Sequence, residues 1–276
     1  MGEWKVIDPN PNPIVGYTVG FEYQRPLDEA SLVALSDAHG QFRRELPRRN
    51  EQRAVTLLQL GLPPLPAGPH PLAGVAFSSF RPDGTIGKTL SAVQQTISFM
   101  IADYQRWAEF WPQAERLLRV MADHGPKELP VIALLLNANN RFEWSSSDEP
   151  PDLRLILRED SVYVAPHLLT CRDAAHSFHG FVDIHAEPPG TRLDNIMIAS
   201  IPAKQGSTHL DVNFSFRLQL ESPFRTAAEM FVAKDSDPWS SLRIGLESLH
   251  QLNNRLFCAT IAPSIVERIP GLPQSC

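Results

Sequence analysis

Residues 237–269 read DPWSSLRIGLESLHQLNNRLFCATIAPSIVERI, and they carry the clearest helical pattern in the chain. The large apolar residues recur at spacings of three or four positions, which places them on one stripe of an α-helix. The stripe consists of Trp239, Leu242, Leu246, Leu249, Leu252 and Leu256. An amphipathic helix of this length buries its stripe against a sheet or other helices. We therefore expect Leu246, Leu249 and Leu256 to lie in the core.

The same stretch contains signals for where its helices begin and end. Asp237 can accept hydrogen bonds from the free backbone N–H groups of a first turn, and Pro238 suits the first helical position. The pair Asn253-Asn254 is expected to loosen the end of the helix. Pro263 can open a short second helix that runs through Glu267.

Upstream of this helix the chain alternates between strand and helix patterns. Strands are predicted at residues 14–23, 53–60, 74–80, 86–101, 131–144, 153–157, 161–165, 177–185, 196–201 and 210–220, and helices at residues 27–45 and 103–124. Residues 61–71 hold five prolines and predict a surface loop.

The order of these elements predicts an α+β fold. Helices occur apart from runs of meandering strands, which favours mainly antiparallel sheets with helices packed on one face. The polar loop after residue 144 divides the chain into residues 1–148 and 149–276. Two similar halves and one continuous domain are both compatible with this order.

Composition excludes several classes of protein. The 276 residues are 43% hydrophobic, which excludes wholesale disorder, and the net charge of −6 argues against a globally basic nucleic-acid binder. The three cysteines form no CxxC pair and suit a reducing compartment. The first residues lack the apolar core of a signal peptide, and no stretch is long and apolar enough to span a membrane. We expect a cytoplasmic protein.

The densest group of potential metal ligands lies at residues 176–185. His179, Asp183 and His185 share one face of the predicted strand, because side chains alternate along a strand. Asp183 and His185 are neighbours on that face, whereas His179 lies roughly 13 Å from Asp183 along a straight strand. A metal-assisted hydrolase is one hypothesis for this cluster, and histidines bonded within a half-buried sheet are the alternative.

A second cluster is cationic. Its members are Arg43, Arg44, Arg48, Arg49 and Arg53, the only dense run of positive charge in the sequence. Such a cluster can bind phosphates, and Phe42 is the only aromatic residue beside it. Nucleic-acid binding is the functional interpretation, and a solvated helix end and loop is the structural one.

A third group follows the apolar part of the strand predicted at residues 131–144. It consists of Asn139, Asn140, Arg141 and Glu143. Polar side chains where a strand ends can line a cleft, and they can equally form a hydrogen-bond network that fixes strand pairing.

Motifs that would identify a reaction are missing from the sequence. GxSxG does not occur, and no cysteine has a recognisable catalytic surrounding. Residues 84–89 end in GKT, but Pro82 stands where the phosphate-binding loop requires glycine. The GKT also opens a β-rich stretch, so no helix N-terminus would face a phosphate there. We expect a hairpin turn, and the sequence implies no cofactor.

Short motifs spread over the chain resemble a family of sporadically distributed bacterial proteins. They are Pro13-Ile14-Val15 with Phe21 and Pro26-Leu27, then Asn140-Arg141-Phe142, and finally Leu249-His250, Asn254, Leu256-Phe257 and Ile261. These match the family's PIVE-like start, its Asn-Arg-aliphatic signature and its closing LH…N.IF…IT pattern. The sequence departs from the family at Gly16, where Glu is usual, and at Ala262, where Thr is usual.

The resemblance implies a fold layout but no established activity. The patchy distribution of the family implies mobile defence or toxin-neutralising genes. With the missing catalytic motifs, it favours a non-catalytic cytosolic binding or regulatory protein that acts through a protein partner. The metal-assisted hydrolase and the nucleic-acid binder remain the two alternative functions. The sequence does not give the oligomeric state.

Overall fold

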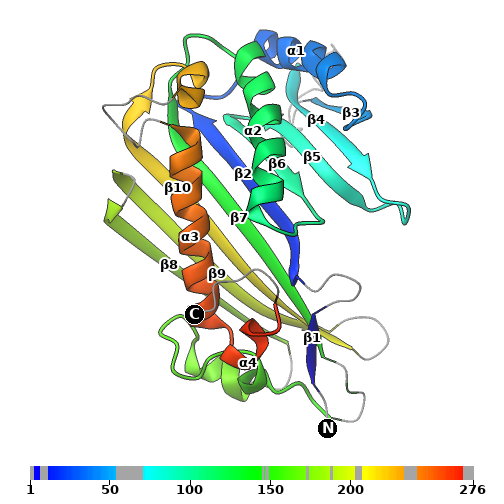
Figure 1. The fold of residues 1–276 in the computed structure, drawn as a ribbon, viewed down its shortest axis with the longest axis vertical. Helices are drawn as coiled ribbons and strands as arrows, with labels where there is room; N and C mark the ends of the chain where they lie inside the picture. The colour runs from blue at the N-terminus through cyan, green and yellow to red at the C-terminus, as the bar shows by residue number, and fades with distance from the viewer. Residues whose placement is uncertain are drawn as a thin grey trace, which may run out of the picture.

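The structure is a computed structural model, and it describes residues 3–6, 12–53, 71–144, 146, 149–171, 174–186, 189–202, 207–232 and 241–269, without the side chains of residues 6, 185 and 186. In these residues one antiparallel sheet of ten strands organises the chain (Figure 1). The strands are β1 (Trp4–Val6), β2 (Ile14–Tyr23), β3 (Arg48–Arg53), β4 (Leu72–Phe80), β5 (Ile86–Val93), β6 (Thr96–Ile101), β7 (Val131–Trp144), β8 (Ala175–Ala186), β9 (Gly190–Pro202) and β10 (Thr208–Phe224).

The strand order is β3-β4-β5-β6-β2-β7-β10-β9-β8, and β1 pairs with one end of β7. The long strand β7 lies at the centre, between β2 and β10. The sheet is therefore continuous from the first part of the chain to the last, and its two edges are β3 and β8.

Helices cover one face of this sheet, as Figure 1 shows for α1, α2 and α3. The helices are α1 (Glu29–Asp37), α2 (Trp107–His124), α3 (Leu242–Thr260) and α4 (Pro263–Val266), with 3-10 turns η1 (Ala38–Gln41), η2 (Leu153–Leu155), η3 (Pro166–Thr170) and η5 (Ala227–Phe231). The predicted α+β fold, with helices on one face of an antiparallel sheet, is confirmed.

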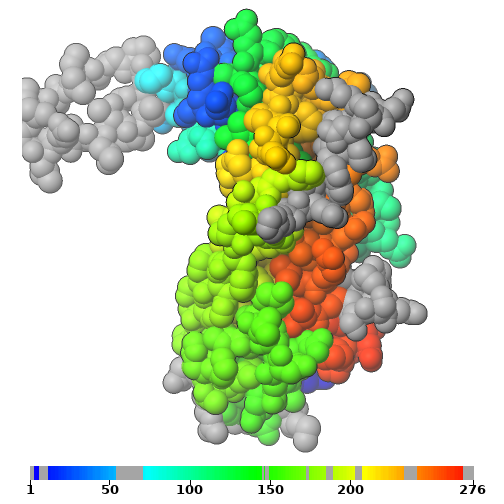
Figure 2. All heavy atoms as spheres, turned by 90° about the vertical axis from the view of Figure 1, so that its left-hand side faces the viewer, coloured from blue at the N-terminus to red at the C-terminus, as the bar shows by residue number. Residues whose placement is uncertain are grey.

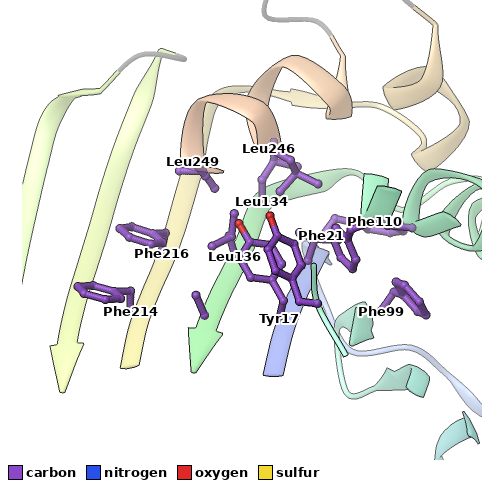
Figure 3. Packing of buried hydrophobic residues seen from close by; sticks show 14 of the residues in the cluster. Tyr17, Phe21, Phe99, Phe110, Leu134, Leu136, Phe214, Phe216, Leu246 and Leu249 are labelled. Carbon is purple, nitrogen blue, oxygen red and sulfur yellow. The ribbon is translucent and has the colours of Figure 1, made fainter. Parts of the chain in front are cut away.

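Alternation of side chains builds the core between sheet and helices. On β7 and β10, residues such as Leu134, Leu136, Phe214 and Phe216 are buried, while most of their neighbours in sequence are half-exposed. Figure 3 shows these side chains on the side of the sheet where α3 lies. Leu246, Leu249 and Leu256 of α3 are buried, as the helical stripe predicted.

The opposite face of the central strands, which we call the open face, is polar. Arg141 of β7 donates to both carboxylate oxygens of Asp211 on β10, at 2.6 and 2.8 Å. Arg217 of β10 reaches across to Glu22 of β2 at 2.7 Å. The first ion pair joins neighbouring strands, and the second spans β7, on a face that remains half-exposed to water.

Both ends of α3 differ from the bounds that the sequence suggests. α3 begins at Leu242, and Ser241 caps it by accepting a hydrogen bond from the Ile244 N–H at 3.3 Å. Asp237, Pro238 and Trp239 lie outside the described residues. The helix also continues through Asn253-Asn254 to Thr260. The short helix from Pro263 is confirmed.

Other corrections concern short strands. The strand predicted at residues 86–101 is a hairpin of β5 and β6, because Gln94 adopts a φ of 54° and turns the chain. Residues 153–157 and 161–165 form 3-10 helix and turns instead of strands. Asp152 accepts a hydrogen bond from the Arg154 N–H and starts that turn. Of the strand predicted at residues 53–60, only Arg53 is described, and it is the last residue of β3. The other residues of that prediction lie outside the described part of the chain.

The hairpin around the GKT sequence forms as predicted. Gly84 adopts a φ of 82°, in the left-handed region that glycine tolerates. The Asp83 carboxylate accepts hydrogen bonds from the Thr85 N–H at 2.9 Å and the Thr85 hydroxyl at 2.6 Å. This geometry is a turn between β4 and β5.

Candidate functional site

A pocket of about 330 Å³ lies between the beginning of α2, the middle of α3 and the sheet beneath them. We call it the α2–α3 pocket. Its lining consists of residues 12–14, residues 104–108, Asn140, five residues of α3 (Glu247, His250, Asn253, Asn254 and Phe257) and Ile269. Its size is at the lower end of the range for small-ligand sites.

His250 lies at the centre of this pocket. Its ring stacks on the Trp107 indole, with centroids 4.5 Å apart and planes inclined by 8°. Its Nδ1 lies 2.9 Å from the Tyr17 hydroxyl, and its Nε2 lies 3.3 Å from Nδ2 of Asn254. Because an amide nitrogen can only donate, Nε2 accepts in the neutral ring, and Nδ1–H donates to the Tyr17 oxygen.

Burial favours the uncharged forms of the groups in the pocket. It lowers the pKa of His250 to about 4, so the imidazole is neutral at physiological pH. Burial also raises the pKa of Tyr17, with smaller contributions from Tyr104 and the Glu247 carboxylate. The pKa of Tyr104 is raised by burial and then by Glu247. Both phenols therefore remain protonated beside a carboxylate.

Two hydrogen-bond acceptors in the pocket lack a partner among the described residues. Oδ1 of Asn253 is buried, and none of those residues donates to it. The side chain of Asn253 is only 3% exposed. No lysine or arginine in the described part of the chain forms an ion pair with Glu247, although this carboxylate is half-buried. Buried polar groups are nearly always bonded, so an orphaned acceptor requires an explanation.

The stretches that carry the family resemblance converge on this pocket. Pro13 and Ile14 come from the start of β2, Asn140 from β7, and His250 and Asn254 from α3. The three stretches are separated from one another by more than a hundred positions in sequence. Asn140 is buried, and its Nδ2 donates to the Val212 carbonyl at 2.9 Å.

Strand alternation divides the predicted cleft residues between the two faces of the sheet. Asn140 is buried on the helix side and lines the α2–α3 pocket. Asn139, Arg141 and Glu143 lie on the open face, where Arg141 pairs with Asp211 and Glu143 lies opposite His209. The four residues therefore do not form one cleft.

The predicted metal ligands lie on edge strand β8. The Nε2 of His179 lies 2.8 Å from the Ser177 hydroxyl, and Asp183 pairs with Arg192 at 3.2 Å. The side chain of His185 lies outside the described residues. In the part of the chain that the structure describes, no three His, Cys, Asp or Glu side chains converge as a metal site requires. The metal site at His179, Asp183 and His185 stays a prediction.

The arginine cluster is spread over a turn and an edge strand. Arg43 and Arg44 follow η1, while Arg48, Arg49 and Arg53 belong to β3. Glu51 lies within the cluster and pairs with Arg49 at 3.6 Å and with Arg53 at 3.2 Å. The carboxylate reduces the local positive charge, and the nucleic-acid interface remains a prediction.

At the opposite edge of the sheet, apolar side chains are exposed on the open face. Phe178, Val182 and Ile184 of β8 are 61%, 66% and 66% exposed, and Leu193 and Ile201 of β9 are exposed beside them. Phe178 pairs with Met197 and Val182 with Leu193, so these side chains share the open face. Figure 2 shows yellow-green residues of β8 and β9 at the surface along the side of the molecule. We call these five exposed residues the β8 patch.

Comparisons with family models, curated proteins and solved structures find no match for this chain. Among the described helices, none is long and apolar enough to cross a membrane. Cys171 is a free thiol, whereas Cys258 is disulfide-bonded.

Proposed function

We propose that the protein is a non-catalytic binding protein that acts through a protein partner, and that the partner adds a strand to β8. The observation that carries the proposal is the exposure of Val182 and Ile184, each 66%, on a twelve-residue edge strand. A long, apolar edge strand that is exposed tends to pair with other chains, unless charged side chains on the strand or another element packed over it prevents the pairing. Addition of a strand is an established mode of peptide recognition.

The difference between the two sheet edges supports this choice. The six residues of β3 are all exposed and polar, RRNEQR, and three of them are arginines. Charges of this kind protect an edge from strand addition. On β8 the residues of the open face are apolar from Phe178 to Ile184 except for Gly180. A partner strand with apolar residues at alternate positions would extend the β8 patch.

The test is affinity capture from native lysate with the tagged full chain, comparing wild type with the Val182→Lys variant. Val182 is exposed, so lysine leaves the fold intact but places a charge in the docking surface. A matched control is Phe80→Lys, which alters an exposed apolar residue of β4 at the far side of the sheet. We expect stoichiometric capture by wild type and Phe80→Lys, and loss of capture by Val182→Lys.

Hydrogen exchange of the complex then locates the contact. Protection of residues 175–186 is expected, because added backbone hydrogen bonds slow exchange. Capture that is equal in all three proteins would contradict the β8 site. Self-association abolished by Val182→Lys would identify a second copy as the occupant and contradict a different partner. The cytoplasmic location and the defence or toxin-neutralising role belong to this proposal, and the identity of the captured partner tests them.

A further inference from the structure

The α2–α3 pocket contains two acceptors that the described chain leaves unpaired. Oδ1 of Asn253 is buried and accepts no hydrogen bond from the described residues. Such an atom destabilises the folded protein, because it has lost its hydrogen bonds to water and gained none in return. Glu247 is a half-buried carboxylate that forms no ion pair with a described lysine or arginine. Both belong to α3 and line the same pocket. A bound group that donates hydrogen bonds to Asn253 Oδ1 and to the Glu247 carboxylate would satisfy both acceptors.

The pocket has the surroundings that strengthen such bonds. The stacked Trp107 and His250 rings and the buried phenols of Tyr17 and Tyr104 exclude water from its walls. Low local dielectric makes a hydrogen bond to a carboxylate stronger than it is in water. His250 cannot compensate Glu247, because burial holds its pKa at about 4 and the ring carries no charge. A bound cation would therefore pair with Glu247 without repulsion from His250.

The spacing of the acceptors defines the kind of molecule. Glu247 and Asn253 are six residues apart on one helix, which corresponds to roughly 9 Å along its axis. We propose that the α2–α3 pocket binds an extended cationic amine or guanidine, with its charged end at Glu247 and an N–H donor at Asn253. This site is independent of the β8 patch. Arg106, the other charged lining residue, has an exposed side chain at the beginning of α2 and leaves the inner part of the pocket acceptor-rich.

Agmatine is a suitable probe because it has a guanidinium and an ammonium at opposite ends of a short chain. Titration calorimetry with the full-length protein measures its affinity, and the fluorescence of Trp107, which lies in the pocket wall, gives a second readout. We expect saturable binding of one agmatine per chain. N-butylurea, which has N–H donors but no charge, should bind at least about tenfold more weakly, since a hydrogen bond between charged groups is worth more than a neutral one.

Two variants separate a ligand role from a structural one. Glu247→Gln keeps the shape of the side chain and removes its charge, so agmatine affinity should fall at least about tenfold. Asn253→Leu removes the orphaned acceptor and keeps the branching of the side chain. It should abolish binding while the melting temperature of the free protein stays unchanged or rises. Gln251→Ala, an exposed position on α3, is the matched control and should bind as wild type does.

Three results would overturn the proposal. The first is absence of saturable binding of agmatine, putrescine and N-acetylarginine amide at millimolar concentration. The second is an affinity for agmatine that Glu247→Gln leaves unchanged. The third is a lower melting temperature of Asn253→Leu, which would show that this amide stabilises the fold and does not await a ligand.

Discussion

At the scale of single residues, enclosure determines the charge of His250. The ring is packed against Trp107 and bonded to Tyr17, and water does not replace these contacts. Protonation would place a charge in this setting, so the pKa is lowered from 6.5 to about 4. The folded state therefore binds fewer protons than the unfolded state between these two pH values.

This difference predicts a pH dependence of stability. His250 contributes fully above about pH 6.5, and its contribution declines as the pH falls through the window towards 4. The shift corresponds to at most about 3 kcal/mol. Urea unfolding at several pH values should show a smaller loss of stability for His250→Gln than for wild type over this window. Parallel curves for the two proteins would contradict a buried neutral His250.

Residue-scale prediction from the sequence identified the core and, of the α2–α3 pocket, only Asn140. The stripe of α3 identified Leu246, Leu249 and Leu256 as buried, because helical periodicity encodes which side faces inward. Glu247, His250 and Asn254 share a second stripe of the same helix, at spacings of three and four. This polar stripe beside the apolar one was the available signal for the α2–α3 pocket. The partners Tyr17 and Trp107 could not be predicted, since only the folded chain brings them together.

At the scale of elements, α3 is a structural part of the core and not a detachable arm. It packs against β7, and the residues that face the sheet are buried. Leu249 is 1% exposed, so its side chain is already out of contact with water in the folded protein. The stability of the helix therefore comes from tertiary packing.

Leu249→Ala tests this packing. The substitution removes buried methyl groups and leaves a cavity, which should reduce the free energy of unfolding by about 2–5 kcal/mol. Thermal and urea melts measure the change. Gln251→Ala on the exposed side of α3 should alter stability by less than about 0.5 kcal/mol. An unchanged melting temperature for Leu249→Ala would mean that α3 is not part of the core.

The sequence specified long elements better than short ones. The bounds of β2 and β7 match their prediction, because ten or more alternating, β-branched and aromatic residues outweigh local effects. Residues 153–165 contain equally apolar side chains, but Leu153, Ile156 and Leu157 face the core at spacings of three and four. A short segment does not distinguish these two patterns. The caps Ser241 and Asp152 then decide the boundaries through single hydrogen bonds.

At the scale of the whole molecule, the continuous sheet joins the two predicted parts of the chain. β7 belongs to residues 1–148, and one of its long edges pairs with β10 from residues 149–276. α3 from the second part covers β7. Strand order of this kind is not encoded by local patterns, and the sequence left two halves and one domain as alternatives.

A fragment of residues 1–148 is therefore expected not to fold cooperatively. It would lose β10 and α3, which together pair and cover β7. Circular dichroism during urea titration should show a gradual change for the fragment and a single steep transition for the full chain. Mixing the fragment with residues 149–276 provides a control, because reconstitution should restore the steep transition. A steep transition of the isolated fragment would establish an autonomous N-terminal domain.

The position of β7 between β2 and β10 has a consequence during synthesis on the ribosome. β7 ends at Trp144 and β10 at Phe224, so about 80 residues must be added before this pairing can be completed. At roughly 5–20 residues per second, the nascent chain waits roughly 4–16 seconds with one edge of its central strand unpaired. α3, which closes over that strand, emerges later still. We expect chaperones to shield β7 from other growing chains over that interval.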